Sequence, residues 1–107
     1  MFKVGDRVWD KKKKCLDTVK QVMYESYVLE SDIRYAINEK QLHQTAQTMF
    51  EELGFSKSPN SKELYIVVMD YVEFDLETKT YLTSIENITP QLHQAIHQKL
   101  IELGWIE

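Results

Sequence analysis

The sequence predicts an α+β protein with the element order ββββ-α-βββ-α. Two observations carry this prediction. Short segments that alternate apolar and polar residues, as strands do, occupy much of residues 1–38 and 63–84. Segments with apolar residues at helical spacing lead into Glu-Leu-Gly at 52–54 and again at 102–104. We therefore expect a β-meander over 1–38 and an α-βββ-α unit over 39–107, which could pack together as one compact domain.

The first part is predicted to form about four short strands. They cover residues 2–9, 16–23, 27–30 and 33–37. Gly5 and Asp6 interrupt the first of them with a turn. In the last, Ile33, Tyr35 and Ile37 alternate with other residues, so one of its faces should be buried. The opening pattern hydrophobic-x-hydrophobic-Gly-Asp-x-Val resembles SH3-like small barrels, including the KOW and Tudor types, which implies a fold but no ligand.

The first helix is predicted to begin near Asn38, with Gln41 at the third helical position in a capping-box arrangement. Its apolar stripe would consist of Leu42, Ala46, Met49, Phe50 and Leu53. Gly54 suits the left-handed end of such a helix, with Phe55 folding back on the last turn.

The middle of the second part is predicted to be a three-stranded antiparallel sheet. The segment LYIVVMDY (64–71) is apolar enough for a central strand. A half-buried strand over 72–77 would follow, and Thr78-Lys79 would turn the chain into a third strand over 80–84.

The second helix is predicted to have Thr89 as its cap and Pro90 at its first position. Its segment LHQAIHQKLIELGW (92–105) repeats LHQTAQTMFEELGF (42–55) at a distance of fifty residues. The shared residues are those that bury one helix face and end the helix, whereas positions between them differ. We therefore expect both copies to be packing elements and not a duplicated functional site.

The same segments also resemble a known group of proteins. MFEELGF, EFDLETKTY, ITPQLHQAI and the closing ELGW are similar to sequences of small proteins encoded by phages and prophages of Gram-positive bacteria. The resemblance covers residues 49–105. It implies an accessory protein of a mobile element, in the cytoplasm of the bacterial host, that binds and alters a host component. The family has no established activity, so the resemblance assigns no catalytic residue.

An acidic row is the first candidate surface. Glu73, Asp75 and Glu77 would project from one side of a strand, about 7 Å apart, and Asp70 and Glu63 add to their field. Such a row could imitate nucleic-acid phosphates and occupy a basic groove of a host protein, for example a defence nuclease, as anti-CRISPR or anti-restriction proteins do. An ordinary solvated sheet face is the alternative.

A basic loop is the second candidate surface. Residues 1–20 contain seven bases and three acids, a net charge of +4, whereas the rest of the chain carries −8. Lys11, Lys12, Lys13 and Lys14 could contact a phosphate backbone, with Trp9 as a stacking platform. The alternative function is therefore a nucleic-acid-binding module that uses the N-terminal part.

No catalytic residue, metal site or cofactor is expected. His93 and His97 are four residues apart, but Gln94 stands where a zinc protease needs a carboxylate, and His43 is expected to face solvent. Cys15 follows four lysines, which would lower the pKa of its thiol, yet no other feature marks a nucleophile. We expect a soluble protein without a membrane segment, and a homodimer is possible.

Overall fold

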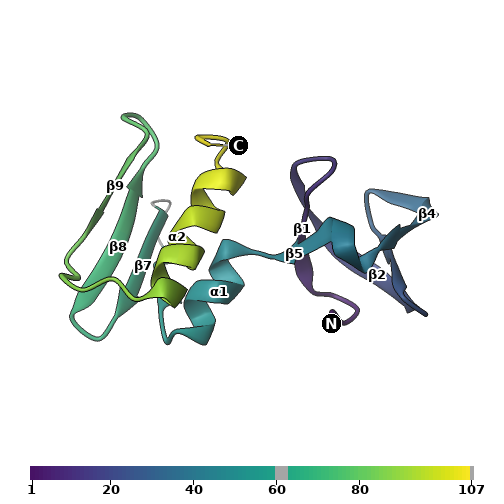
Figure 1. The fold of residues 1–107 in the computed structure, drawn as a ribbon, viewed down its shortest axis with the longest axis horizontal. Helices are drawn as coiled ribbons and strands as arrows, with labels where there is room; N and C mark the ends of the chain where they lie inside the picture. The colour runs from purple at the N-terminus through teal and green to yellow at the C-terminus, as the bar shows by residue number, and fades with distance from the viewer. Residues whose placement is uncertain (60–62, 107) are drawn as a thin grey trace. The chain divides into compact units, whose positions relative to one another are not determined.

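The structure is a computed structural model that describes residues 1–59 and 63–106. The α+β class is confirmed. Within these residues the chain forms two α-helices, a five-stranded antiparallel sheet and a four-stranded antiparallel sheet (Figure 1). The chain divides into two compact units, Met1–Thr45 and Ala46–Glu107, here named the N-unit and the C-unit. The division follows Thr45 and not residue 38, because a short strand after residue 38 still belongs to the N-unit.

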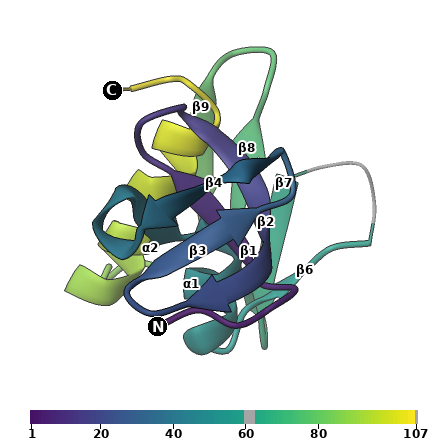
Figure 2. The same cartoon turned by 90° about the vertical axis from the view of Figure 1, so that its right-hand side faces the viewer.

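The N-unit is a meander in which consecutive strands among the first four pair with one another, and the fifth strand returns to pair with the first. Its elements are β1 (Arg7–Asp10), β2 (Cys15–Met23), β3 (Ser26–Leu29), β4 (Asp32–Asn38), the 3-10 helix η1 (Glu39–Gln41) and β5 (Leu42–Gln44). The strand order in the sheet is β4-β3-β2-β1-β5, and Figure 2 shows β1 to β4 as consecutive hairpins. The long strand β2 pairs with β1 through its first half and with β3 through its second half, with a bulge between Val19 and Gln21. The four predicted strands are thus present, but the first covers Arg7–Asp10 and not residues 2–9.

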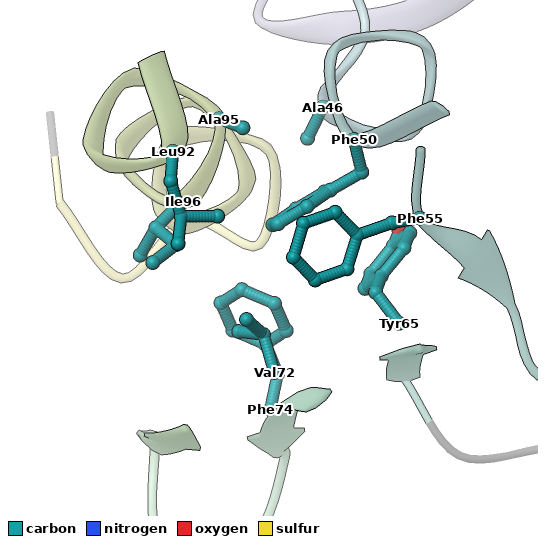
Figure 3. Packing of buried hydrophobic residues seen from close by; sticks show 9 residues of the cluster. All are labelled: Ala46, Phe50, Phe55, Tyr65, Val72, Phe74, Leu92, Ala95 and Ile96. Atoms are coloured by element: carbon teal, nitrogen blue, oxygen red, sulfur yellow. The ribbon is translucent and has the colours of Figure 1, made fainter. Parts of the chain in front are cut away.

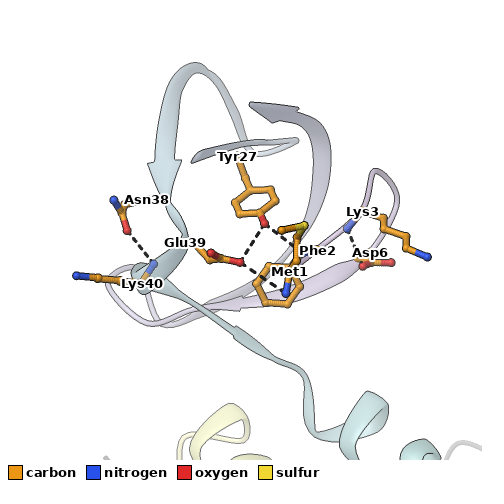
Figure 4. A network of polar contacts seen from close by, with 8 residues as sticks. All are labelled: Met1, Phe2, Lys3, Asp6, Tyr27, Asn38, Glu39 and Lys40. Atoms are coloured by element: carbon orange, nitrogen blue, oxygen red, sulfur yellow. Dashed lines mark hydrogen bonds and ion pairs between the residues drawn. The ribbon is translucent and has the colours of Figure 1, made fainter. Parts of the chain in front are cut away.

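A small apolar cluster closes the N-unit. It consists of Val8, Val19, Tyr27, Leu29 and Leu42, all less than 10% exposed. Polar contacts surround this cluster. The Tyr27 hydroxyl lies 3.1 Å from the Phe2 amide, which donates to it, and 3.1 Å from Glu39 Oε1, to which it donates (Figure 4). These two bonds tie the segment before β1 to the start of η1.

The predicted start of the first helix is wrong. Asn38 does act as a cap, because its side chain accepts a bond of 2.9 Å from the Lys40 amide, but the helix that it caps is the three-residue η1. Residues 42–44 then form β5, where Leu42 pairs with Asp10 and is buried in the N-unit core. Strand pairing with β1 satisfies the backbone of this segment, and this tertiary contact outweighs the local helical pattern.

The C-unit packs two helices on one face of its sheet (Figure 1). Its elements are α1 (Ala46–Glu52), β6 (Ser56–Lys57), β7 (Glu63–Val67), β8 (Asp70–Asp75), β9 (Thr80–Thr83) and α2 (Pro90–Glu102). The strand order is β6-β7-β8-β9. Between helices and sheet lies the larger core, shown in Figure 3, with Phe50 at its centre. The Phe50 ring stacks on that of Tyr65 at a centroid distance of 4.3 Å and meets Phe55 edge-on at 5.4 Å.

Two strand predictions need correction. LYIVVMDY is not one central strand: its chain reverses at Val68 and Met69, so its two halves belong to β7 and β8. Ile33 and Tyr35 do not face a core, because they are 59% and 62% exposed on the edge strand β4. An alternating pattern shows which residues share a face, but whether another layer covers that face depends on the tertiary fold.

The predicted second helix is confirmed at both ends. The Thr89 side chain accepts a bond of 3.2 Å from the Leu92 amide, and Pro90 occupies the first helical turn. Leu92 and Ile96 are buried in the core, and the helix ends before Gly104, which has a φ of +76°. Trp105 packs against the same core as the helix.

Candidate functional site: the outer face of the C-unit sheet

The predicted acidic row is broken by a turn. Along β8, Val72 and Phe74 are buried toward the helices, so Glu73 and Asp75 lie on the opposite, outer face. Glu77 does not continue this row, because the strand ends at Asp75 and residues 76–79 form a turn. The prediction that three carboxylates project from one strand is therefore wrong, and only the first two share a strand face.

The outer carboxylates other than Glu73 also have structural roles. Asp75 Oδ1 accepts bonds from the amides of Glu77 at 3.0 Å and Thr78 at 3.3 Å, which shapes the turn into β9. Asp70 Oδ1 accepts a bond of 3.1 Å from the Ser84 hydroxyl. Both carboxylates remain exposed, but these hydrogen bonds account for their positions without any ligand.

Glu63 belongs to the inner side of the sheet. Its Oε2 lies 2.8 Å from Nζ of Lys99 and 3.5 Å from Nζ of Lys57. Burial raises the pKa of Glu63, but the hydrogen bond and charge of Lys99, with the contribution of Lys57, outweigh it and lower the pKa below its ordinary value. Lys99 itself is only 8% exposed. The sequence gives no sign of this pair, since the residue at the matching position of the first repeat is Met49.

The outer face of the sheet is mainly apolar around Glu73. Leu64 on β7 and Leu82 on β9 are its direct cross-strand partners, and Ile66 pairs with Tyr71 beside them. Leu82 is 59% and Ile66 39% exposed. We name these five residues the outer face: a half-buried carboxylate surrounded by aliphatic and aromatic side chains. The charges are visible in the sequence, but these apolar neighbours are not, because they come from three strands whose register the sequence does not specify.

The β7–β8 hairpin extends this apolar surface. Val68 and Met69 at its tip are 92% and 91% exposed. Together with Asp70 and residues of the outer face on β7 and β8, they line an open groove of about 280 Å³. Val68 has a φ of +50°, a conformation that is unfavourable for a β-branched residue. An exposed apolar side chain held in a strained conformation has no evident packing role in the C-unit.

The lysine loop lies between β1 and β2, as expected, but Trp9 does not serve it as a platform. Lys11 to Lys14 are exposed, whereas Trp9 is only 6% exposed, so its ring is not open for stacking. The loop is built on Asp10, whose Oδ1 accepts bonds from the amides of Lys12 at 3.0 Å and Lys13 at 3.1 Å.

The histidines and the cysteine form no catalytic cluster with one another. His93 and His97 are exposed on α2 with ring centroids 6.3 Å apart, while His43 is half-buried in β5. Among residues 1–59 and 63–106, no three His, Cys, Asp or Glu side chains lie together as metal ligands would. The pKa of Cys15 is raised, first by burial and then by Asp10 and Asp17, which together outweigh the lowering by Lys13, so the expected net lowering is wrong.

The described helices include none with the length and apolar character needed to cross a membrane. Comparisons with protein-family models, with curated proteins and with solved structures found no match to the chain.

Proposed function

We propose that this chain is a non-enzymatic interaction protein whose C-unit binds a partner protein through the outer face of its sheet. The observation that carries the proposal is the group of exposed Ile66 and Leu82 and half-buried Leu64 and Tyr71 around Glu73, which continues onto exposed Val68 and Met69. Contiguous apolar surface of this kind is characteristic of interaction sites, and aromatic residues and Met are enriched in their centres.

The charges of the C-unit define the chemistry of the partner. Residues 46–107 contain four bases and ten acids, a net charge of −6. Glu73 lies at the centre of the outer face, so a partner that covers it removes water from its carboxylate. That desolvation is unfavourable unless the partner supplies a cation at the same place. The occupant is therefore a protein surface with apolar side chains around a central Lys or Arg.

The resemblance to phage and prophage proteins supports a bacterial host protein as this partner. A nuclease or repressor that handles nucleic acid carries basic surface for the phosphate backbone. Binding of the acidic C-unit to such a surface would make the chain an inhibitor of host defence, in the manner of anti-CRISPR or anti-restriction proteins.

Affinity capture with matched baits tests the proposal. The wild-type chain and the variants Ile66→Lys and Ile88→Lys are used to capture proteins from a lysate of Gram-positive bacteria, with and without nuclease treatment. Ile66 and Ile88 are 39% and 40% exposed, but Ile88 lies outside the outer face, in the segment before α2. We expect a partner that Ile88→Lys retains, that Ile66→Lys loses and that nuclease treatment does not release.

The captured partner is then purified and titrated with Glu73 variants. Glu73→Gln should weaken binding about tenfold or more and Glu73→Lys should abolish it, since the partner's cation is left without its counter-charge. Equal binding by wild type, Ile66→Lys and Glu73→Lys would contradict the proposal. The outer face could instead bind a second copy of the chain, which sedimentation equilibrium of the chain alone detects. A dimer that Ile66→Lys dissociates would show that the outer face serves self-association and not a host partner.

The strained hairpin tip offers a second test. Asn adopts a positive φ more readily than Val, so Val68→Asn should stabilise the C-unit by about 0.5–1 kcal/mol in urea denaturation. The same variant should bind the captured partner more weakly, because it removes the apolar side chain of Val68, which is 92% exposed in the free chain and available to the partner. A variant that is more stable and binds equally well would remove the tip from the proposed interface.

A further inference from the structure

A cleft in the N-unit brings the lysine loop together with an exposed tyrosine. Its volume is about 360 Å³, and it lies between the β1–β2 loop and the β4–η1 segment. Lys12 and Lys13 of the loop, Tyr35 and Asn38 of β4, and the apolar Leu29 are among the residues that line it. None of the residues that line this cleft belongs to the outer face of the C-unit sheet.

The lysine side of the cleft is preformed. Asp10 is fully buried and accepts bonds from the amides of Lys12 and Lys13, and the Gln41 side chain donates to the same oxygen at 2.9 Å. The Lys11 amide donates to the Gln41 carbonyl at 2.9 Å. These bonds fix the loop backbone to η1, so binding a ligand does not require the loop to become ordered first.

The ring of Tyr35 is exposed and available for stacking, as that of Trp9 is not. Tyr35 is 62% exposed, and the guanidinium carbon of Arg34 lies 5.7 Å from the centroid of its ring. An exposed ring beside a guanidinium group is the arrangement on which nucleic-acid bases stack. Lys12 and Lys13, which line the same cleft, are suited to bind phosphate oxygens.

The cleft also contains one carboxylate, that of Asp32. Arg34 pairs with it at 3.4 Å, and hydrogen bonds from Arg34, that of its backbone amide above all, lower the pKa of Asp32. Asp32 is therefore ionised at neutral pH and opposes a phosphate group. It reduces the positive charge of the cleft without cancelling it, because the cleft is lined by two lysines, Lys12 and Lys13.

We propose that this cleft binds single-stranded nucleic acid, with phosphates on Lys12 and Lys13 and a base stacked on Tyr35. The N-unit, residues 1–45, carries nine bases and seven acids, a net charge of +2, in contrast to the acidic C-unit. A single strand fits the site better than a duplex, because in a duplex the faces of the bases are covered by their neighbours. This binding is independent of the proposed protein interface.

Fluorescence anisotropy with labelled twelve-nucleotide DNA and RNA strands of mixed sequence, titrated with the full chain at several salt concentrations, tests the proposal. Tyr35→Ala should weaken binding about tenfold, since loss of one base stack corresponds to between about 5-fold and 150-fold. The control is Tyr24→Ala, whose ring is 91% exposed but does not line the cleft. The two strands show whether DNA or RNA is preferred.

Variants of the cleft lysines and of Asp32 should change nucleic-acid binding in opposite directions. The double variant Lys12→Ala/Lys13→Ala should reduce the slope of log K against log salt by about 1.4, since each contact to a single-strand phosphate contributes about 0.7. Lys11→Ala/Lys20→Ala removes the same charge outside the cleft and should leave the slope nearly unchanged. Asp32→Asn should tighten binding, because it removes the opposing charge.

Three results would overturn the proposal: no binding at low salt, equal losses in the cleft and control variants, or a duplex bound as tightly as a single strand. Variants of the outer face, such as Ile66→Lys, should bind nucleic acid like the wild type. The failure of one proposed site is thereby distinguishable from the failure of the other.

Discussion

The two copies of the Leu-His-Gln to Glu-Leu-Gly segment begin in different structures and end in the same one. Leu42 lies in strand β5 and Leu92 in helix α2, although the same three residues open both copies. Both leucines are buried, at 5% and 4% exposure, so the prediction that each serves packing is confirmed for this position. The same side chains thus fill two cores from two kinds of element.

The two helix ends make equivalent backbone hydrogen bonds. In the first copy the Phe55 amide donates to the Phe50 carbonyl at 3.0 Å, and the Gly54 amide to the Glu51 carbonyl at 3.0 Å. In the second copy Trp105 donates to Leu100 and Gly104 to Ile101, also at 3.0 Å. Both are Schellman ends, in which a residue with positive φ lets the chain bond back to its own last turn.

The beginnings differ because different residues precede them. Thr89 and Pro90 stand before Leu92 and start a helix there. Before Leu42 stands η1, and the helix of the first copy starts only at Ala46, whose amide donates to Glu102 Oε2 at 2.6 Å. A helix end is fixed by a few neighbouring residues, whereas its beginning here depends on what lies upstream and on distant partners.

The largest difference between the copies should lie at the position occupied by Phe50 and Leu100. Phe50 is fully buried and touches three other rings, whereas Leu100 is only partly buried. Phe50→Ala should lower the free energy of unfolding by about 3–5 kcal/mol and Leu100→Ala by about 2 kcal/mol or less. Urea denaturation followed by circular dichroism measures both. Equal losses would show that the two helices contribute alike to the core.

Replacing Lys99 of the second copy by the Met that the first copy has at the same position, Met49, should also destabilise the chain. Among the described cations, Lys99→Met leaves Glu63 with the more distant Lys57. We expect a loss of about 1–2 kcal/mol at pH 7, less than for a fully buried pair because Glu63 remains partly exposed and keeps one cation. The double variant Lys99→Met/Glu63→Gln should recover most of this loss.

The pH dependence of this pair has a definite sign. The pKa of Glu63 is lowered from 4.5 in the folded chain, so its stabilising contribution is present above pH 4.5 and is lost as the pH falls through the folded pKa. The wild type should therefore lose more stability between pH 5 and about pH 3 than Lys99→Met does. Denaturation curves at several pH values measure the difference. A larger acid loss in Lys99→Met would contradict the assignment.

The two glycines should respond alike if the ends are equivalent. At Gly104 an added Cβ meets nothing within 4 Å, and at Gly54 it would meet only a Val67 methyl carbon at 3.8 Å, an ordinary contact. The cost of Gly54→Ala and Gly104→Ala is then the strain of a positive φ alone, about 1–2 kcal/mol each. Thermal denaturation of both variants checks this. Costs that differ by more than about 1 kcal/mol would show that the ends are not equivalent.

These comparisons also show what the sequence could and could not predict. Strands β1 to β4 and the whole of α2 are local: alternation, Thr89-Pro90 and Gly104 specify them within a few residues. The reversal at Val68 and Met69 was missed because neither residue is a usual turn former. The entry of Leu42 into β5 was missed because it depends on pairing with β1, more than thirty residues away.

The candidate sites divide in the same way. The charges of the acidic row and of the lysine loop are visible in the sequence, since each lies within one short segment. The apolar neighbours of Glu73 come from β7, β8 and β9, and Tyr35 on β4 lines a cleft with the lysine loop although the two are more than twenty residues apart in the sequence. In both cases the sequence indicated the polar half of the site, and the register of the strands supplied the rest.

The smallest expected effect concerns how each helix begins. Thr89→Ala removes the local cap of α2, and Glu102→Gln replaces the carboxylate that accepts the Ala46 amide at the start of α1. The first should cost about 1 kcal/mol. The second should cost less, about 0.5 kcal/mol, because the amide oxygen of Gln can still accept the bond but without the charge that favours a helix N-terminus.

Raising the salt concentration screens that charge, so the gap between Glu102→Gln and wild type should narrow in high salt while the effect of Thr89→Ala stays constant. Urea denaturation at low and high salt measures both, with Gln94→Ala, on the exposed side of α2, as the control. A salt-independent loss in Glu102→Gln would mean that shape and hydrogen bonding alone, without charge, set the start of the first helix.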